Sequence, residues 1–259
     1  HSFPTRRSSD LSEQIAHVSS QARTELSCLQ DAPLVTTSAV TGDGLPELLE
    51  ALDAVTSTAP SPATDGRVRI WVDRAFSITG AGTIVTGTLG EGTVATEQNL
   101  ELTSAQARTR VTVRGLQNHN SSVSSIEPVS RVALNLRGVS AQDISRGDAL
   151  ITPDAWHVAD VVDVAGTAVD TIPTDVTVHI GAASLQAHVR PLSDRYARLK
   201  LSRSIPVQVG DRLVVRGSGE RAVASELCAE HPPPMWLSFL LISRLACPCP
   251  HRGPSDPLL

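Results

Sequence analysis

Residues 67–89, RVRIWVDRAFSITGAGTIVTGTL, constrain the fold more than any other stretch of the sequence. Apolar and polar side chains alternate over residues 68–73, and this period of two is typical of a half-buried β-strand. A Gly-Ala-Gly run at residues 80–82 predicts a tight reversal, since glycine adopts the positive φ angles that hairpin turns require. A second strand is predicted over residues 83–88, and Gly87 within it indicates a bulge or a close backbone approach. We therefore expect the opening hairpin of a small barrel.

Short alternating segments separated by glycine turns continue from this hairpin to about residue 225. No helical pattern interrupts them, which is typical of closed antiparallel barrels. We predict a mainly β protein with two consecutive small antiparallel β-barrels, at residues 67–153 and 154–225.

The residues before the barrels have a different pattern. Apolar positions at helical spacing predict an amphipathic helix over residues 12–29, and residues 34–37 indicate a short buried strand. A second helix is predicted over residues 46–55, because proline suits the first helical turn. Residues 58–66 are rich in Ser, Thr, Ala and Pro, so we interpret them as a linker.

Both ends of the sequence differ from the rest. Residues 1–11, HSFPTRRSSDL, lack a starting methionine and form no pattern, so we expect a non-native leader; a basic targeting arm is the alternative. Residues 226–259 contain three successive prolines and follow neither the strand nor the helix period. We expect a disordered or non-native tail there.

Composition narrows the class of protein. A chain of 259 residues has room for about two domains. Hydrophobic residues make up 41% and aromatic residues only 3%, so the core must consist of Val, Leu, Ile and Ala. The net charge of −5 argues against a protein that coats nucleic acid nonspecifically, because such a protein needs a basic face. The four cysteines show no CxxC spacing, so neither a disulfide framework nor a zinc site is predicted.

No signal peptide or membrane span is evident in the sequence. The N-terminus lacks the apolar region of a secretory signal. The most apolar run, residues 235–247, is interrupted by Arg244 and is shorter than the ~20 residues that a membrane span requires. We expect a cytoplasmic protein with no membrane partner.

The barrel segments resemble those of a known family. DRAFSI at residues 73–78, GAGT at 80–83 and VTGT at 85–88 are similar to the start of the second domain of translational GTPases. Further on, RVTVRGLQNHN, SRVALNLRGV and DISRGDAL are similar to the second domain of the selenocysteine-specific elongation factors. HIGAASLQAHVRPL and ARLKLSRSIPVQVGDRLVVR resemble the third domain of the same factors. The resemblance covers roughly residues 30–225 and implies barrels of the elongation-factor type, domains II and III.

Residues 38–45, SAVTGDGL, resemble the last guanine-recognition motif of the GTPase fold. The resemblance implies that residues 12–57 are the C-terminal α/β remnant of a GTPase domain. It also implies that backbone groups of Ser38 and Ala39 approach the guanine base of GTP. An ordinary connection between a strand and a helix has the same composition, so that alternative stays open.

The rest of a nucleotide site is not visible in the sequence. There is no GxxxxGK[ST] phosphate loop and no NKxD guanine motif. The GTP site is therefore expected to be incomplete, with Mg²⁺ bound only when the missing domain is present, and this chain should not hydrolyse GTP alone. His119, His179 and His188 are scattered, so no metal site is predicted, and no Ser-His-Asp or Cys-His arrangement indicates catalytic residues.

The resemblance assigns Arg74 and Arg131 to a pocket that faces the amino acid esterified to the tRNA. A selenol is far more acidic than a thiol, whose reference pKa is ~8.5, so the selenocysteinyl group is an anion at neutral pH while a seryl group is neutral. Guanidinium groups favour the anion in a partly desolvated pocket, and a neutral hydroxyl would leave their donors unpaired. The carboxylate that completes the pocket in the family is expected to come from the first domain.

Arg74 and Arg131 have a simpler interpretation as well. Both could be strand-end residues that pair with surface carboxylates, for instance Arg74 with its neighbour Asp73. Ser130 also stands where the family pattern leads us to expect glutamine.

The densest basic cluster of the sequence lies in the predicted third domain: Arg190, Arg195, Arg198, Lys200 and Arg203. These side chains could contact tRNA phosphates, or they could form a solvated face. The resemblance implies selenocysteinyl-tRNA and the ribosome as partners, with a messenger hairpin bound only through domains that this chain lacks.

Three other functions stay open at this point. The chain could belong to another translational GTPase, such as elongation factor Tu or an initiation factor. It could be part of the GTPase subunit of sulfate adenylyltransferase, or a structural barrel, because fold does not fix function. The Arg74 and Arg131 pair, together with HIGAASLQAHVRPL, favours the selenocysteine-specific elongation factors.

Overall fold

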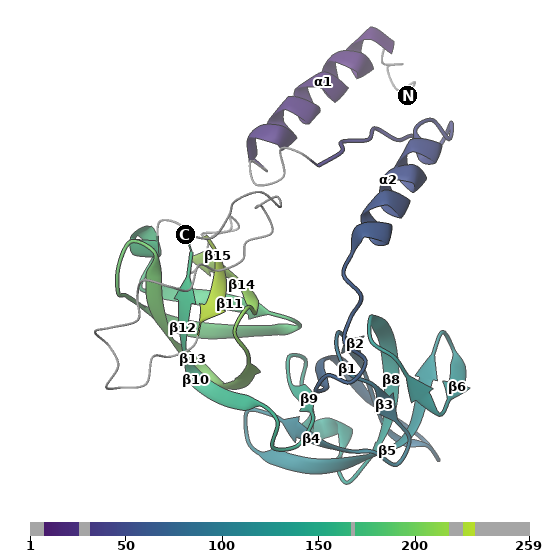
Figure 1. The fold of residues 1–259 in the computed structure, drawn as a ribbon, viewed down its shortest axis with the longest axis vertical. Helices are drawn as coiled ribbons and strands as arrows, with labels where there is room; N and C mark the ends of the chain where they lie inside the picture. Colours follow the sequence, from purple (N-terminus) through teal and green to yellow (C-terminus); the bar gives the residue numbers. More distant parts are fainter. Residues whose placement is uncertain (1–7, 26–31, 167–168, 218–224, 231–259) are drawn as a thin grey trace, which may run out of the picture. The chain divides into compact units, whose positions relative to one another are not determined.

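The computed structural model describes residues 8–25, 32–166, 169–217 and 225–230 (Figure 1). The chain divides into two compact units, residues 1–61 and 62–259. The first unit is helical and the second contains all the strands. None of the helices described is long and apolar enough to cross a membrane.

The first unit consists of α1 (Ser8–Glu25) and α2 (Leu45–Thr58). α1 begins inside the stretch that we expected to be a leader, and residues 1–7 and 26–31 lie outside the described part. α2 follows Gly44, which has a φ of 73°. A Cβ at Gly44 would lie 2.0 Å from the Thr36 carbonyl oxygen, so the turn into α2 requires glycine.

The strand predicted at residues 34–37 is wrong. These residues are extended but form no ladder, and only Val35 among them is even partly covered. An extended segment becomes a strand only when another strand accepts its backbone hydrogen bonds, and the described part of this unit contains no other strand. None of the side chains described in residues 11–61 is buried.

The first barrel confirms the predicted hairpin and its closure. It is an antiparallel six-stranded barrel in the order β4-β9-β1-β2-β8-β5, closed by pairing of β4 with β5. Its strands are β1 (Arg69–Ile78), β2 (Gly82–Leu89), β4 (Asn99–Thr103), β5 (Arg108–Asn118), β8 (Ser130–Arg137) and β9 (Ala149–Ile151). Short additions to it are β3 (Val94–Ala95), β6 (Ser121–Val123), β7 (Ser125–Ile126) and the 3₁₀ helix η2 (Ala141–Asp143).

The second barrel is also closed and six-stranded, in the order β10-β13-β12-β11-β14-β15. Its elements are β10 (His157–Ala165), η3 (Val169–Thr171), β11 (Asp175–Ile180), β12 (Ala183–Pro191), β13 (Tyr196–Val207), β14 (Arg212–Gly217) and β15 (Ser225–Glu230). β15 continues five residues past the boundary expected at residue 225 and closes the barrel against β10 and β14. Residues 231–259 of the expected tail lie outside the described part.

Each barrel has its own core of aliphatic side chains, as the composition predicted. In β8, Val132, Leu134 and Leu136 point inward and are buried, which is the alternation that the sequence indicated. Alternation in β2 likewise turns Val85, Gly87 and Leu89 inward.

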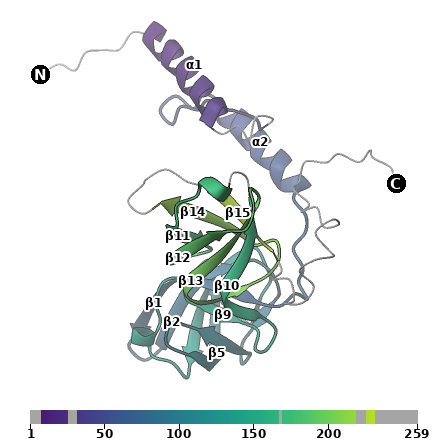
Figure 2. The same ribbon diagram turned by 90° about the vertical axis from the view of Figure 1, so that its left-hand side faces the viewer.

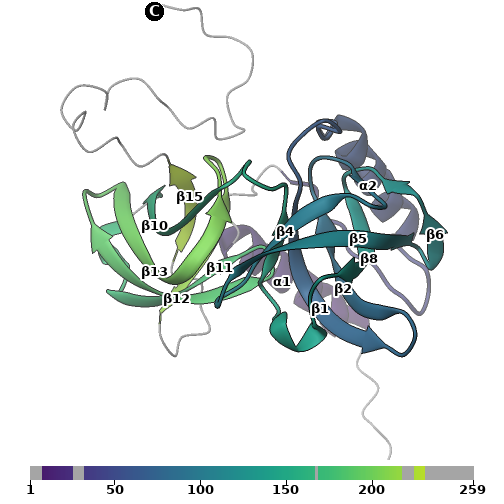
Figure 3. The ribbon, with the colours of Figure 1, turned by 90° about the horizontal axis from the view of Figure 1, so that it is seen from below.

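The two barrels lie side by side within the second unit and share a polar joint (Figures 2 and 3). Arg69 in β1 donates from Nη1 and Nη2 to the two carboxylate oxygens of Asp211, both at 2.6 Å. The Arg67 and Arg69 guanidinium carbons lie 4.1 and 4.5 Å from the ring centre of Trp156, whose indole N–H donates to the Val68 carbonyl. Strand β1, which belongs to the first barrel, therefore also contacts the second barrel.

Candidate functional site

A bulge in β1 shapes the surface around Arg74. Val72 pairs with Gly87 and Arg74 pairs with Thr86, so Asp73 is an extra residue with no opposite partner. Directly opposed residues share a face of the sheet. Because Gly87 faces the core and Thr86 does not, Val72 points inward and Arg74 points to the outer face of the barrel.

Arg131 lies on the same outer face. It opposes Thr88 in β2, and the next residue along β8, Val132, faces the core. β2 stands between β1 and β8, so the strands that carry the two arginines are about 10 Å apart, twice the usual strand spacing. Long side chains on two such strands can reach a common ligand.

Arg131 also contacts the extra residue of the bulge. Its Nη1 lies 2.7 Å from Asp73 Oδ2, with the Arg131 side chain 61% exposed and that of Asp73 20% exposed. This is an ion pair rather than a hydrogen bond, because Asp73 Oδ2 has no hydrogen-bond partner of acceptable geometry. The simpler interpretation, an arginine that pairs with a surface carboxylate, thus applies to Arg131, with Asp73 as the carboxylate.

Arg74 differs from Arg131 in its surroundings. Its side chain is exposed, and no residue in the described part of the chain forms a hydrogen bond or ion pair with its guanidinium. Between the two arginines, Thr86 Oγ1 is buried and also without a partner. The outer face therefore presents an exposed guanidinium without a partner among the described residues and a second one paired with Asp73, and both can contribute to binding an anion.

Two residues of this face were not found from the sequence. Asp73 is in contact with Arg131, in addition to the carboxylate that the resemblance implies from another domain. Asp73 directly precedes Arg74, and strict alternation puts neighbours on opposite faces; only the bulge brings both outward. Thr86 could have been found, since period two places it outward, level with Arg74 across the hairpin.

Ser38 and Ala39 lie in a loop closed by its own hydrogen bonds. Ser38 N–H donates to Asp43 O at 2.9 Å, and Gly42 N–H donates to Ser38 O at 2.8 Å. The Ser38 hydroxyl accepts from Thr41 N–H at 3.2 Å, while Ala39 and Val40 are exposed. The loop can present backbone groups to a base edge.

The five predicted basic residues differ in their partners. Arg198 donates to both carboxylate oxygens of Asp163, at 2.7 and 2.8 Å, and this hydrogen bonding raises the pKa of Arg198. Lys200 donates to Asp160, and that hydrogen bond lowers the pKa of the Asp160 carboxyl. Arg190 opposes Arg198 across β12 and β13, and both Arg190 and Arg195 are exposed.

Arg203 lies apart from the other four basic residues. Its side chain is only 15% exposed, and its Nη2 donates to the Gly147 carbonyl of the first barrel at 2.6 Å. The same nitrogen is 3.5 Å from Asp148 Oδ1. Arg203 therefore belongs to the joint between the barrels.

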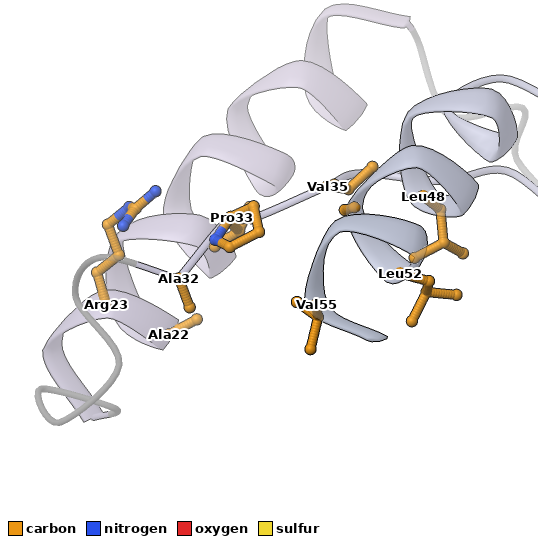
Figure 4. A pocket seen from close by; sticks show the side chains of 10 residues that line it. Ala22, Arg23, Ala32, Pro33, Val35, Leu48, Leu52 and Val55 are labelled. Atoms are coloured by element: carbon orange, nitrogen blue, oxygen red, sulfur yellow. The ribbon is translucent and has the colours of Figure 1, made fainter. Parts of the chain in front are cut away.

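Each of the two units also contains a hollow. A groove of about 480 Å³ in the first unit is lined by apolar side chains of α1, α2 and residues 32–35, including Leu48, Leu52 and Val55 (Figure 4). A hollow of about 620 Å³ in the first barrel is lined by Leu102, Ser104 and Asp143 among others. In the residues described, no three His, Cys, Asp or Glu side chains gather as metal ligands.

Comparison with known proteins shows what the chain is similar to. No family model matches the chain. The sequence is 30% identical over 217 residues, 78% of this chain, to a protein from Desulfomicrobium baculatum named selenocysteine-specific elongation factor. A crystal structure of a bacterial selenocysteine-specific elongation factor superposes with a TM-score of 0.72 and 25% identity, over 85% of this chain and 38% of the other.

The chain is homologous to part of the selenocysteine-specific elongation factors. It spans 34% of the length of the D. baculatum factor. Elongation factor 1-alpha of Methanopyrus kandleri matches a smaller share, 29% identical over 160 residues, which is 52% of this chain and 37% of that protein. The two closed barrels confirm the predicted fold class.

Proposed function

We propose that this chain is part of a selenocysteine-specific elongation factor, which delivers selenocysteinyl-tRNA to the ribosome in a GTP-dependent manner in the cytoplasm. The observation that carries the proposal is the placement of Arg74 and Arg131 on one outer face of the first barrel, within a chain homologous to these factors. The first barrel would hold the aminoacyl end of the tRNA.

Selection would depend on charge. A selenolate next to the unpaired Arg74 guanidinium gains a charge-assisted hydrogen bond, worth about 1.5–3 kcal/mol. A seryl hydroxyl can accept a hydrogen bond from the same guanidinium, but it carries no negative charge and therefore gains less. Arg131 would turn from Asp73 toward the anion, or donate to the anion from one nitrogen while another stays paired with Asp73.

The same proposal covers the contacts with the nucleotide, the tRNA phosphates and the messenger hairpin. Ser38 and Ala39 would contact the guanine base of GTP once a phosphate-binding domain completes the site, and Mg²⁺ would bind there. Arg190 and Arg195 are the basic residues of the second barrel most available to tRNA phosphates, because Arg198 and Lys200 already pair with carboxylates. A messenger hairpin would bind through other domains.

The test compares the affinities of the 259-residue chain for selenocysteinyl-tRNA and seryl-tRNA. Arg74→Ala and Arg131→Ala should each weaken selenocysteinyl-tRNA binding about tenfold to hundredfold and leave seryl-tRNA binding nearly unchanged. Arg137→Ala is the matched control, since Arg137 is an equally exposed arginine in the same strand, 62% against 61%.

Equal losses for both tRNAs, or losses in the Arg137 control as large as in the two variants, would contradict selection by charge. The similarity to elongation factor 1-alpha favours one second candidate, a carrier of aminoacyl-tRNA without preference for selenocysteine. That candidate predicts equal affinities for both tRNAs in the unmodified chain.

A further inference from the structure

The loop of residues 145–148 anchors β1 directly beside the bulge. Val72 N–H donates to the Asp148 carbonyl at 2.8 Å, and Gly147 N–H donates to the Val72 carbonyl at 2.9 Å. Val72 is the last regularly paired residue before the extra residue Asp73. The loop therefore fixes the backbone from which Asp73 and Arg74 turn outward.

The second barrel holds this loop from the other side. Arg203 Nη2 in β13 donates to the Gly147 carbonyl at 2.6 Å and lies 3.5 Å from Asp148 Oδ1. Gly147 has a φ of +89°, and a Cβ there would lie 2.7 Å from the Ala183 Cα in β12. The loop is thus packed against β12 and bonded to β13, with no room to shift toward the second barrel.

Asp148 is buried in this contact and Arg203 is partly buried, with side chains 3% and 15% exposed. Asp148 Oδ2 accepts from Ser145 N–H at 2.8 Å, which closes the loop on itself. Burial raises the pKa of the Asp148 carboxyl, while the Ser145 hydrogen bond and the Arg203 charge act in the opposite direction. Removal of Arg203 would leave a buried carboxylate and a buried carbonyl without their cationic partner.

We propose that Arg203 is a positioning residue: through residues 145–148 it holds the bulge that presents Asp73 and Arg74, so that the second barrel sets the geometry of the charged face on the first. The consequence for tRNA selection rests on the proposed function, whereas the mechanical link does not. Arg203, which the sequence grouped with possible tRNA contacts, would act on the aminoacyl group from a distance.

The link is tested by amide hydrogen exchange in the full 259-residue chain. Arg203→Met removes the donors and keeps an apolar stem, and Arg203→Lys keeps one charged donor. Arg216→Met, at an exposed arginine of β14 in the same barrel, is the control. In Arg203→Met the Val72 and Gly147 amides should exchange about tenfold faster or more, because a hydrogen bond from a charged group is lost. Ala133, in the β2–β8 ladder, should not change, and Arg203→Lys should restore part of the protection.

The functional arm measures the ratio of selenocysteinyl-tRNA to seryl-tRNA affinity in the same variants. The ratio should fall in Arg203→Met, recover in part in Arg203→Lys and stay at the unmodified value in Arg216→Met. Unchanged exchange at Val72 and Gly147, a uniform rise across both barrels, or faster exchange with an unchanged ratio would each overturn the proposal. If the unmodified chain shows no preference between the tRNAs, the proposed function fails, and the exchange arm alone decides whether Arg203 holds the bulge.

Discussion

At the scale of single residues, the charged face depends on Gly87, which has no side chain and lies opposite the residue before the bulge. Val72 opposes Gly87, and a Cβ at Gly87 would lie 2.4 Å from the Trp71 carbonyl oxygen and 2.5 Å from Ile70 Cγ2. The sequence predicted a bulge or a close approach at Gly87. The structure shows the close approach at Gly87 and puts the bulge across the ladder, at Asp73.

Gly87→Ala should therefore destabilise the first barrel by about 1–3 kcal/mol, the usual cost of added volume in a packed site. Gly115→Ala is the matched control, because a Cβ there would meet only Asn135 Cβ, at 3.9 Å. The free energy of unfolding in urea measures both. A Gly87→Ala variant as stable as Gly115→Ala would show that β1 moves aside freely and that the bulge is not fixed by this contact.

At the scale of elements, prediction from sequence succeeded where the pattern within a segment is enough to assign it. The strands of both barrels alternate between core and surface, so Val132, Leu134 and Leu136 could be assigned inward without a structure. Residues 34–37 alternate too little to decide, and their state depends on a partner strand that no local pattern reveals. β15 was cut short because the composition changes before the strand ends.

The charged site was predictable only in part for a related reason. Arg74 and Arg131 follow from motif resemblance, but Asp73 joins them through a bulge, which adds one residue to a strand without a sequence signal that we could use. We grouped the five basic residues by their proximity in the sequence, and Arg203 lies apart from the other four. In β13, period two separates Arg198 and Lys200 from Arg203, so the parity of the strand would have placed Arg203 on a different side.

Helix α2 differs from the barrel strands because none of its side chains is buried in a core. Leu49, Leu52 and Val55 are 62%, 51% and 59% exposed. Leu52→Ala should therefore change stability by no more than about 0.5 kcal/mol and keep the helical signal in far-ultraviolet circular dichroism, since alanine is the better helix former. Leu134→Ala, at a fully buried barrel position, should cost about 2–5 kcal/mol. A loss of helical signal in Leu52→Ala would mean that the groove of Figure 4 is a true packing contact.

At the scale of the whole second unit, the joint between the barrels makes them one mechanical body. Arg69 stacks on Trp156, bonds Asp211 through both terminal nitrogens and also donates to the Pro206 carbonyl at 3.1 Å. Gly181 packs so closely on Trp71 that a Cβ there would lie 2.2 Å from its ring. A displacement of the second barrel would therefore also displace β1, the strand that carries Asp73 and Arg74.

This coupling predicts how the barrels unfold. The Arg69 and Asp211 side chains are 15% and 8% exposed, so Arg69→Ala leaves a buried carboxylate without its counter-charge, at a cost of about 3–5 kcal/mol. Calorimetry should show one transition for both barrels in the unmodified chain and two in Arg69→Ala, because the first barrel then unfolds without the second. Arg110→Ala is the control: its pair with Asp154 is 68% and 77% exposed, so its loss should cost about 0–1 kcal/mol and leave one transition. Equal effects of the two substitutions would mean that the joint adds no more than a surface ion pair and that the barrels fold as independent bodies.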